Sequence, residues 1–221
     1  MKSTMKSLVL GSVMTSSLLA GGVAMADSPL TANIGVTSNY IWRGMTQTGD
    51  LSAVSGGIDY AHDSGAYAGT WTSNLGGGDY EWDLYAGYAF DAGPVGLDLG
   101  LIDYRYPVSA TDFREAYVNA SFKMLTAGVA YTFGSDDDTT ATFSKGDLYY
   151  SLGASFDVAK DMAAGITVGR YNFDDATAED YTHYQLSLSK DDFTFALDKN
   201  NATGPADKMR ISASWSKSFD L

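Results

Sequence analysis

After its first 26 residues, the chain alternates apolar and polar side chains in one short segment after another. This period of two constrains the fold more than any other feature. The alternation is strict in Leu30–Thr37 (LTANIGVT) and continues over longer runs in 80–90 and 125–133. Successive side chains of a β-strand point to opposite faces, so each segment predicts a strand with one apolar and one polar face. No stretch after residue 26 has the roughly 20 apolar residues of a membrane-spanning helix.

Twelve such segments are predicted within one all-β domain that covers residues 27–221. The four prolines lie at segment ends or between segments, where a missing N–H does not interrupt a ladder. No break between segments has the composition of an interdomain linker. The segments run near residues 29–43, 51–61, 65–74, 79–91, 95–106, 113–123, 124–134, 147–158, 162–173, 180–190, 192–199 and 208–219.

The connections between these segments alternate in length. Those after even-numbered segments are minimal, as in Ala92-Gly93-Pro94 and Lys123-Met124, whereas 44–50 and 135–146 are longer and polar. Short turns at one end, longer loops at the other and an even strand number are typical of outer-membrane barrels. In hydrocarbon every backbone polar group needs an internal partner, which a closed sheet supplies. We therefore predict an antiparallel transmembrane β-barrel of 12 strands.

Residues 1–26 are predicted to be a secretory signal peptide that directs export to the bacterial outer membrane. Lys2 and Lys6 precede an apolar run over 8–23, and Ala24-Met25-Ala26 is a small-x-small cleavage site. A membrane anchor is the alternative, but Ser and Gly interrupt the run. Cleavage would shorten the chain from 221 to 195 residues. It would also remove two lysines and no acid, which changes the formal net charge from −13 to −15.

Composition excludes several classes of function. The absence of Cys excludes disulfide frameworks, Cys-ligated metals and thiol nucleophiles. The negative charge argues against a nucleic-acid partner, because phosphates require Lys and Arg. A mean hydropathy of −0.12 is compatible with a membrane barrel, since half the residues of each strand face the lumen.

Aromatic residues gather near the predicted strand ends, where a membrane interface favours rings with one wet side. Soluble β-proteins also place Tyr and Trp in strands, but the clustering at ends favours interfacial girdles. Glycines inside strands, such as Gly87 and Gly100, are expected at bends of a curved wall. The predicted girdle residues are Tyr40, Trp42, Tyr80, Trp82, Phe90, Tyr104, Tyr106, Tyr131, Phe133, Phe156, Tyr171, Phe173, Trp215 and Phe219.

One stretch, 33–47 (NIGVTSNYIWRGMTQ), resembles the opening strand of the proteobacterial TorF family of proposed porins. Further matches follow in order at 56–60, 67–74, 81–88 and 104–107, and at the closing segment 210–219. The resemblance covers nearly the whole exported chain. It implies an outer-membrane β-barrel of a Gram-negative bacterium and a pore, and it assigns no catalytic or ligand-binding residue.

Charged strand residues are expected to face the lumen, because a charge facing lipid costs a few kcal/mol at the midplane. A lumen about 24 Å across between backbones, with more acids than bases, predicts a narrow cation-preferring channel. A salt-bridged plug that closes the lumen is the alternative, and the face of Trp71 is left open. The candidate pore-lining residues are Arg43, Glu81, Asp83, Asp98, Arg105, Glu115 and Arg210. The remaining members of the inward set are Asn33, Thr37, Asn39, Asp59, Tyr117, Asn119, Lys123 and Asp198.

The function predicted from these features is that of a porin for passive diffusion of small polar solutes or ions. The main alternative is a non-conducting outer-membrane barrel with a structural, adhesion or ligand-binding role, and a soluble secreted β-protein is a further one. An enzyme is not expected, because the chain has only His62 and His183 and no Gly-x-Ser-x-Gly.

No cofactor and no metal site is predicted, and the expected partners are outer-membrane lipid and lipopolysaccharide. The acidic runs 136–138, 174–175 and 179–180 lie in predicted outer loops. They are either solvated or share divalent cations with lipopolysaccharide phosphates. Their spacing is not that of a calcium-binding hand.

Overall fold

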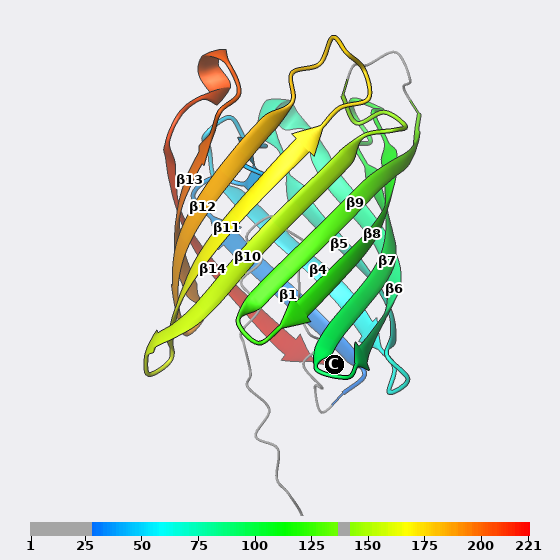
Figure 1. Ribbon diagram of the computed structural model, residues 1–221, viewed down its shortest axis with the longest axis vertical. Coiled ribbons are helices and arrows are strands. Elements are labelled where there is room, and N and C mark those ends of the chain that lie inside the picture. The colour runs from blue at the N-terminus through cyan, green and yellow to red at the C-terminus, as the bar shows by residue number, and fades with distance from the viewer. Residues whose placement is uncertain (1–27, 137–141) are drawn as a thin grey trace, which may run out of the picture.

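The structure is a computed structural model that describes residues 28–136 and 142–221. Most of these residues belong to one antiparallel sheet that closes on itself (Figure 1). The predicted signal peptide, and Asp137 and Asp138 of the first acidic run, lie outside the described residues. Across the described part of the chain, no helix is long and apolar enough to cross a membrane.

Twelve strands form the barrel, which confirms the predicted fold and strand number. Each pairs with its neighbours along the chain, and β1 also pairs with β14, from Thr31 opposite Asp220 to Thr37 opposite Ser214. The barrel strands are β1 (Leu30–Thr37), β4 (Ala53–Ala61), β5 (Ala66–Asn74), β6 (Tyr80–Ala92), β7 (Val95–Arg105), β8 (Phe113–Phe122), β9 (Leu125–Ser135), β10 (Leu148–Ala159), β11 (Met162–Asn172), β12 (Tyr181–Lys190), β13 (Phe193–Asn200) and β14 (Arg210–Asp220).

The first predicted segment, 29–43, is wrong beyond Thr37, where the chain leaves the wall. Residues 38–52 instead form a loop that contains the short strands β2 (Ile41–Trp42) and β3 (Met45–Thr46). Between them, Arg43 and Gly44 have φ angles of 47° and 79°, which is the backbone that a two-residue hairpin turn requires. We call residues 38–52 the inner hairpin. Every other predicted segment boundary lies within two residues of the observed one.

The connections separate into two ends, as their lengths predict. The turn end carries the short connections, such as Lys123-Met124, and both ends of the described chain. The loop end carries the inner hairpin and the connections 75–79, 106–112, 173–180 and 201–209, together with the described part of 136–147 (Figure 1). Short 3₁₀ turns, η1 (Gly76–Gly78) and η2 (Gly204–Ala206), lie in two of these connections.

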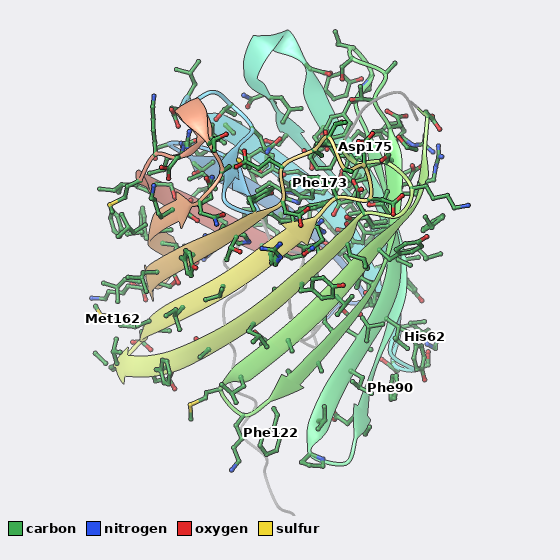
Figure 2. All side chains as sticks on the ribbon, turned by 45° about the horizontal axis from the view of Figure 1, so that its top comes forward. His62, Phe90, Phe122, Met162, Phe173 and Asp175 are labelled. Atoms are coloured by element: carbon green, nitrogen blue, oxygen red, sulfur yellow. The ribbon has the colours of Figure 1, made fainter. Side chains whose placement is uncertain are left out.

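The outward face of the barrel is apolar, whereas the inward face carries small, polar and aromatic side chains. Ile211 and Leu152 point outward and are 74% and 67% exposed. Figure 2 shows Phe90 and Phe122 on the outside toward the turn end. Trp71, whose face the sequence left open, points inward, where its ring meets that of Tyr40 edge-on at 5.6 Å.

Several predicted girdle residues lie inside the barrel and not at its surface. Tyr40, Trp42, Tyr104 and Tyr171 are all buried, because their strand parity or the inner hairpin directs them inward. Other members of the predicted girdle do point outward and are exposed, including Tyr80, Trp82, Phe90, Tyr131, Phe133, Phe156 and Phe219.

Glycines on the inward face make room for tyrosine rings. This role differs from the bends of the wall that the sequence pattern predicts at glycines. A methyl group added at Gly69 would lie 2.5 Å from the Tyr85 ring, and one at Gly100 would collide with the Tyr117 ring in the same way. In sheets, an aromatic ring laid across a neighbouring glycine covers backbone that would otherwise lack packing. Alternating Gly and Tyr therefore lets large rings lie flat against the wall.

Candidate functional site

The inner hairpin crosses the lumen at the loop end and contacts strands on several sides. Asn200 on β13 donates to the Gly44 carbonyl at 2.7 Å. Tyr40 donates to Glu81 on β6 at 3.0 Å. Near the end of the hairpin, Asp50 accepts a hydrogen bond from Arg210 on β14, also at 2.7 Å. The hairpin is therefore fixed inside the barrel from several directions.

Arg43, at the tip of the hairpin, forms a buried bidentate ion pair with Glu115 on β8. Its two terminal nitrogens donate to the two carboxylate oxygens at 2.7 and 2.6 Å. Tyr104 and Tyr171 also donate to this carboxylate, each at 3.3 Å. The side chains are 7% and 2% exposed. Paired planar groups of this kind form the strongest class of protein hydrogen bonds.

Aromatic rings surround this ion pair. The guanidinium carbon of Arg43 lies 4.3 Å from the ring centre of Trp42 and 4.1 Å from that of Tyr149, so it is held between two π-faces. Trp42 in turn packs against Tyr104, Phe113, Phe143 and Tyr171, at 5.6 to 6.2 Å between ring centres. Phe173, labelled at the loop end in Figure 2, stacks on Tyr171 at 4.6 Å.

Burial changes along the lumen from the loop end to the turn end. On β10, Tyr149 and Ser151 are buried, whereas Gly153 and Ser155 are half-buried; β11 and β12 show the same gradient. A cavity of about 20 Å³ remains between the hairpin and β8–β10, room for a single water. The inner hairpin and its aromatic neighbours thus fill the loop half of the lumen, while the turn half stays in contact with solvent.

The predicted pore-lining residues are mostly inward, but their surroundings differ. Glu81, Asp83 and Asp98 point inward from β6 and β7, the first two at 2% and 4% exposure. Glu115 and Arg210 are also inward. Arg43 is inward too, although it comes from the inner hairpin and not from a wall strand as predicted.

The placement of Arg105 in the lumen was wrong. It lies seven residues after Asp98 on β7, and an odd separation places two strand residues on opposite faces. Its guanidinium binds Asp103 at 2.7 Å and lies 5.3 Å from the ring centre of Trp82, which is an outward residue. Lys123, from the wider inward set, lies in an exposed turn.

The family model described as "Bacterial protein of unknown function (Gcw_chp)" matches residues 23–208. The chain belongs to the Gcw_chp family. No curated protein matches its sequence.

Solved structures with a similar fold include porins and an outer-membrane channel. The KdgM porin aligns with a TM-score of 0.57 at 8% identity, over 86% of this chain and 99% of that one. An outer membrane channel from Pseudomonas putida F1 aligns at 0.59 and 11% identity, over 92% and 100%. The NanC porin aligns at 0.50 and 14% identity, over 87% and 100%. At these identities the likeness shows that this Gcw_chp chain has a porin-type barrel fold.

The two histidines of this Gcw_chp barrel occupy different environments. His183 on β12 is buried, stacks on Tyr149 with 10° between ring planes, and lies 2.9 Å from the Tyr149 hydroxyl through Nε2. His62 lies in an exposed turn at the turn end, where its ring meets Ser64 (Figure 2). Among the described residues, no group of three or more His, Asp or Glu side chains is placed to hold a metal ion.

Two loop carboxylates are tied down by hydrogen bonds at the loop end. The hydrogen bond from Arg210 holds the pKa of Asp50 below its ordinary value. Burial alone would raise the pKa of Asp79, but hydrogen bonds from Ser109, Tyr80 and Val108 outweigh it and lower that pKa. Both carboxylates therefore stay charged at neutral pH and act as fixed anchors for neighbouring loops.

Sequence reasoning placed Tyr117 in the inward set but gave no role to the hydroxyl groups of Tyr67 and Tyr85 in the lumen. Tyr67, Tyr85 and Tyr117 have inward parity, and each reaches a polar group on another strand. The usable signal was a glycine directly opposite the tyrosine on the adjacent strand, as in the pairs Tyr67–Gly87 and Gly69–Tyr85.

Proposed function

We propose that this Gcw_chp barrel is an outer-membrane porin through which small polar solutes or ions diffuse passively, with access controlled by the inner hairpin. One observation carries the proposal. The loop half of the lumen is filled largely by a connecting segment and the aromatic side chains around it, whereas the inward face of several strands carries many small residues, most of them toward the turn half. These include Ser151, Gly153, Ser155, Gly165, Thr167, Ser187, Ser189, Ser212 and Ser214. A wall of this kind leaves a passage whenever the connecting segment moves aside.

Residence in the outer membrane is supported by the outward face. Its leucine, isoleucine, valine and aromatic side chains are exposed along nearly every strand. An apolar band of this extent is not stable in water and matches the lipid-facing surface of a transmembrane barrel. The resemblance of 33–47 to the TorF family agrees with this assignment. The proposed surroundings are outer-membrane lipid and lipopolysaccharide, with the turn end facing the periplasm after export.

The proposed solutes are small and neutral or cationic. One structure of the KdgM porin contains disordered oligogalacturonate, which is a polyanion. The inward carboxylates Asp59, Asp83 and Asp98 of this chain would repel such a chain, so that substrate is not transferred here.

The alternative is a non-conducting barrel, and the filled loop half favours it. In that case the buried pair Arg43–Glu115 would be a permanent structural plug. A catalytic role is not proposed for either case. His183, the buried histidine, is engaged with Tyr149 inside the aromatic packing and not in a solvent-open cleft.

Planar-bilayer recording of the purified chain tests the proposal. Thr37 and Ala53 are direct partners across β1 and β4, so a two-residue Asn-Gly turn can replace the whole of residues 38–52. We expect brief openings in the wild type at raised voltage and a steady current in the replaced chain. Heat-modifiable gel mobility controls for folding of both.

The outcomes separate the two functions. A wild type that never conducts at any voltage, beside a folded replaced chain that does, would show a permanently plugged barrel. A folded replaced chain without current would refute the channel altogether.

A further inference from the structure

Two tyrosines on adjacent strands of the turn half reach in opposite directions and hold two aspartates. Tyr85 on β6 lies across Gly69 of β5 and donates to Asp59 on β4. Tyr67 on β5 lies across Gly87 of β6 and donates to Asp98 on β7 at 2.6 Å. The pairs Tyr67–Gly87 and Gly69–Tyr85 are neighbours in the same ladder. The wall β4–β7 therefore presents two fixed carboxylates with two tyrosine rings between them.

The other hydrogen bonds of these carboxylates come from neutral groups as well. Asn33 donates to Asp59 at 3.1 Å, and Asn119 donates to Asp98 at 3.3 Å. Within residues 28–136 and 142–221, no ion pair includes Asp59 or Asp98. Neutral donors fix the position of a carboxylate and leave its charge in place. The field of both groups is therefore directed into the lumen.

Their position distinguishes them from the other inward carboxylates. Glu115 is neutralised by Arg43, and Glu81 and Asp83 are buried behind the inner hairpin. Asp59 and Asp98 are half-buried and lie in the turn half, where the lumen is in contact with solvent. An ion that crosses the barrel must pass them whether or not the hairpin has moved.

We propose that Asp59 and Asp98, held by Tyr85 and Tyr67, are the residues that determine selectivity for cations over anions. The inference rests on the proposed channel function. Two fixed negative charges beside a water-filled path attract cations and repel anions, and low-dielectric walls strengthen this field. The tyrosine rings add π-faces that favour organic cations such as small amines.

The test is the reversal potential in a potassium chloride gradient across a planar bilayer. The variant Asp59→Asn with Asp98→Asn keeps the shape and the hydrogen-bonding capacity of both side chains. We expect its ratio of K⁺ to Cl⁻ permeability to fall about tenfold, from the Coulomb attraction of two charges a few ångströms from the path.

A matched control removes the same number of charges from the same end of the barrel but outside the lumen. In Asp161→Asn with Asp192→Asn, the altered carboxylates lie near Lys160 and Lys217, and the permeability ratio is expected to stay within twofold of the wild type. Methylammonium in place of potassium measures the preference for organic cations.

The results distinguish this inference from the channel itself. Absence of any current overturns the proposed function and this inference with it. A current whose permeability ratio is near one, or is unchanged in the Asp59 and Asp98 variant, overturns the inference and leaves the channel intact.

Discussion

Replacement of Arg43 by Ala is the sharpest perturbation that the structure offers. It removes the only ion-pair partner of Glu115 within the described residues and leaves a carboxylate that is 2% exposed beneath the inner hairpin. Breaking a buried pair by removing one partner costs about 3–5 kcal/mol, because the remaining charge stays desolvated. That cost applies to the state with the hairpin inside. With the hairpin moved out, Glu115 would be in water.

The expected size of the effect follows from the contacts that remain. Tyr104 and Tyr171 still donate to Glu115, each at 3.3 Å, so the lower end of the range applies. A cost of about 3 kcal/mol corresponds to a change of about 100-fold in the ratio of open to closed barrels, since every 1.4 kcal/mol is tenfold. Single-channel recording measures this ratio as the open probability at fixed voltage.

A second variant separates loss of the Arg43–Glu115 contact from general destabilisation of the barrel. In Arg43→Ala with Glu115→Ala neither charge of this pair remains buried, and the open probability is expected to fall back at least tenfold toward the wild type. Arg170→Ala removes an exposed pair with Asp180 and serves as the control. Equal open probability in the wild type and in Arg43→Ala would refute the reasoning, as would equal values in the single and double variants.

Three further predictions follow from the placement of other residues. Because Arg210 lowers the pKa of Asp50, this contact stabilises the closed hairpin fully at pH values above an ordinary carboxyl pKa of about 4. The stabilisation is lost as pH falls through the lowered pKa, so the open probability should rise in that range. Asp50→Asn should abolish the rise. Gly87→Ala would place a methyl group 2.6 Å from the Leu99 carbonyl and against Tyr67, so it should destabilise the barrel by about 1–3 kcal/mol in urea unfolding. Gly134→Ala should not, because its methyl group would meet only the Arg114 side chain, at an ordinary contact distance of 3.8 Å. Arg105→Ala should leave the reversal potential unchanged, because its side chain points outward; a shift would place it on the ion path.

The strand pattern was predictable because one physical rule fixes it. Each strand of a closed barrel separates an outer from an inner medium, so the period of two appears in every strand and locates its residues to within two positions. The same parity correctly directed Glu81 and Asp83 inward. Arg105 was misplaced because charge was weighed more heavily than parity, although an outward arginine at the loop end can bind Asp103 and lie over Trp82.

The inner hairpin could not be predicted in the same way, since it is also β-structure and continues the alternation past Thr37. Its turn is Arg43-Gly44, where an arginine occupies a left-handed conformation that Asn or Gly more commonly adopts. The contacts of Arg43 with Glu115 and Tyr149 hold this uncommon backbone in place. Those contacts come from distant strands, and no local pattern in the sequence reveals them.

The placement of Glu115 suits both arrangements of the lumen that the proposed channel requires. With the hairpin inside the barrel, the Glu115 carboxylate accepts hydrogen bonds from Arg43 and two tyrosines. With the hairpin outside, water would replace these donors, so the carboxylate has hydrogen-bond partners in both arrangements. The aromatic rings, in contrast, favour the arrangement with the hairpin inside. Trp42, buried against Phe113 and Tyr171, would lose its packing in the open arrangement, and burying such a side chain contributes about 1.5–3 kcal/mol. In the proposed channel the closed arrangement is therefore the one favoured at rest, and the open one would be a minor state that voltage or loss of the Arg43 contact populates.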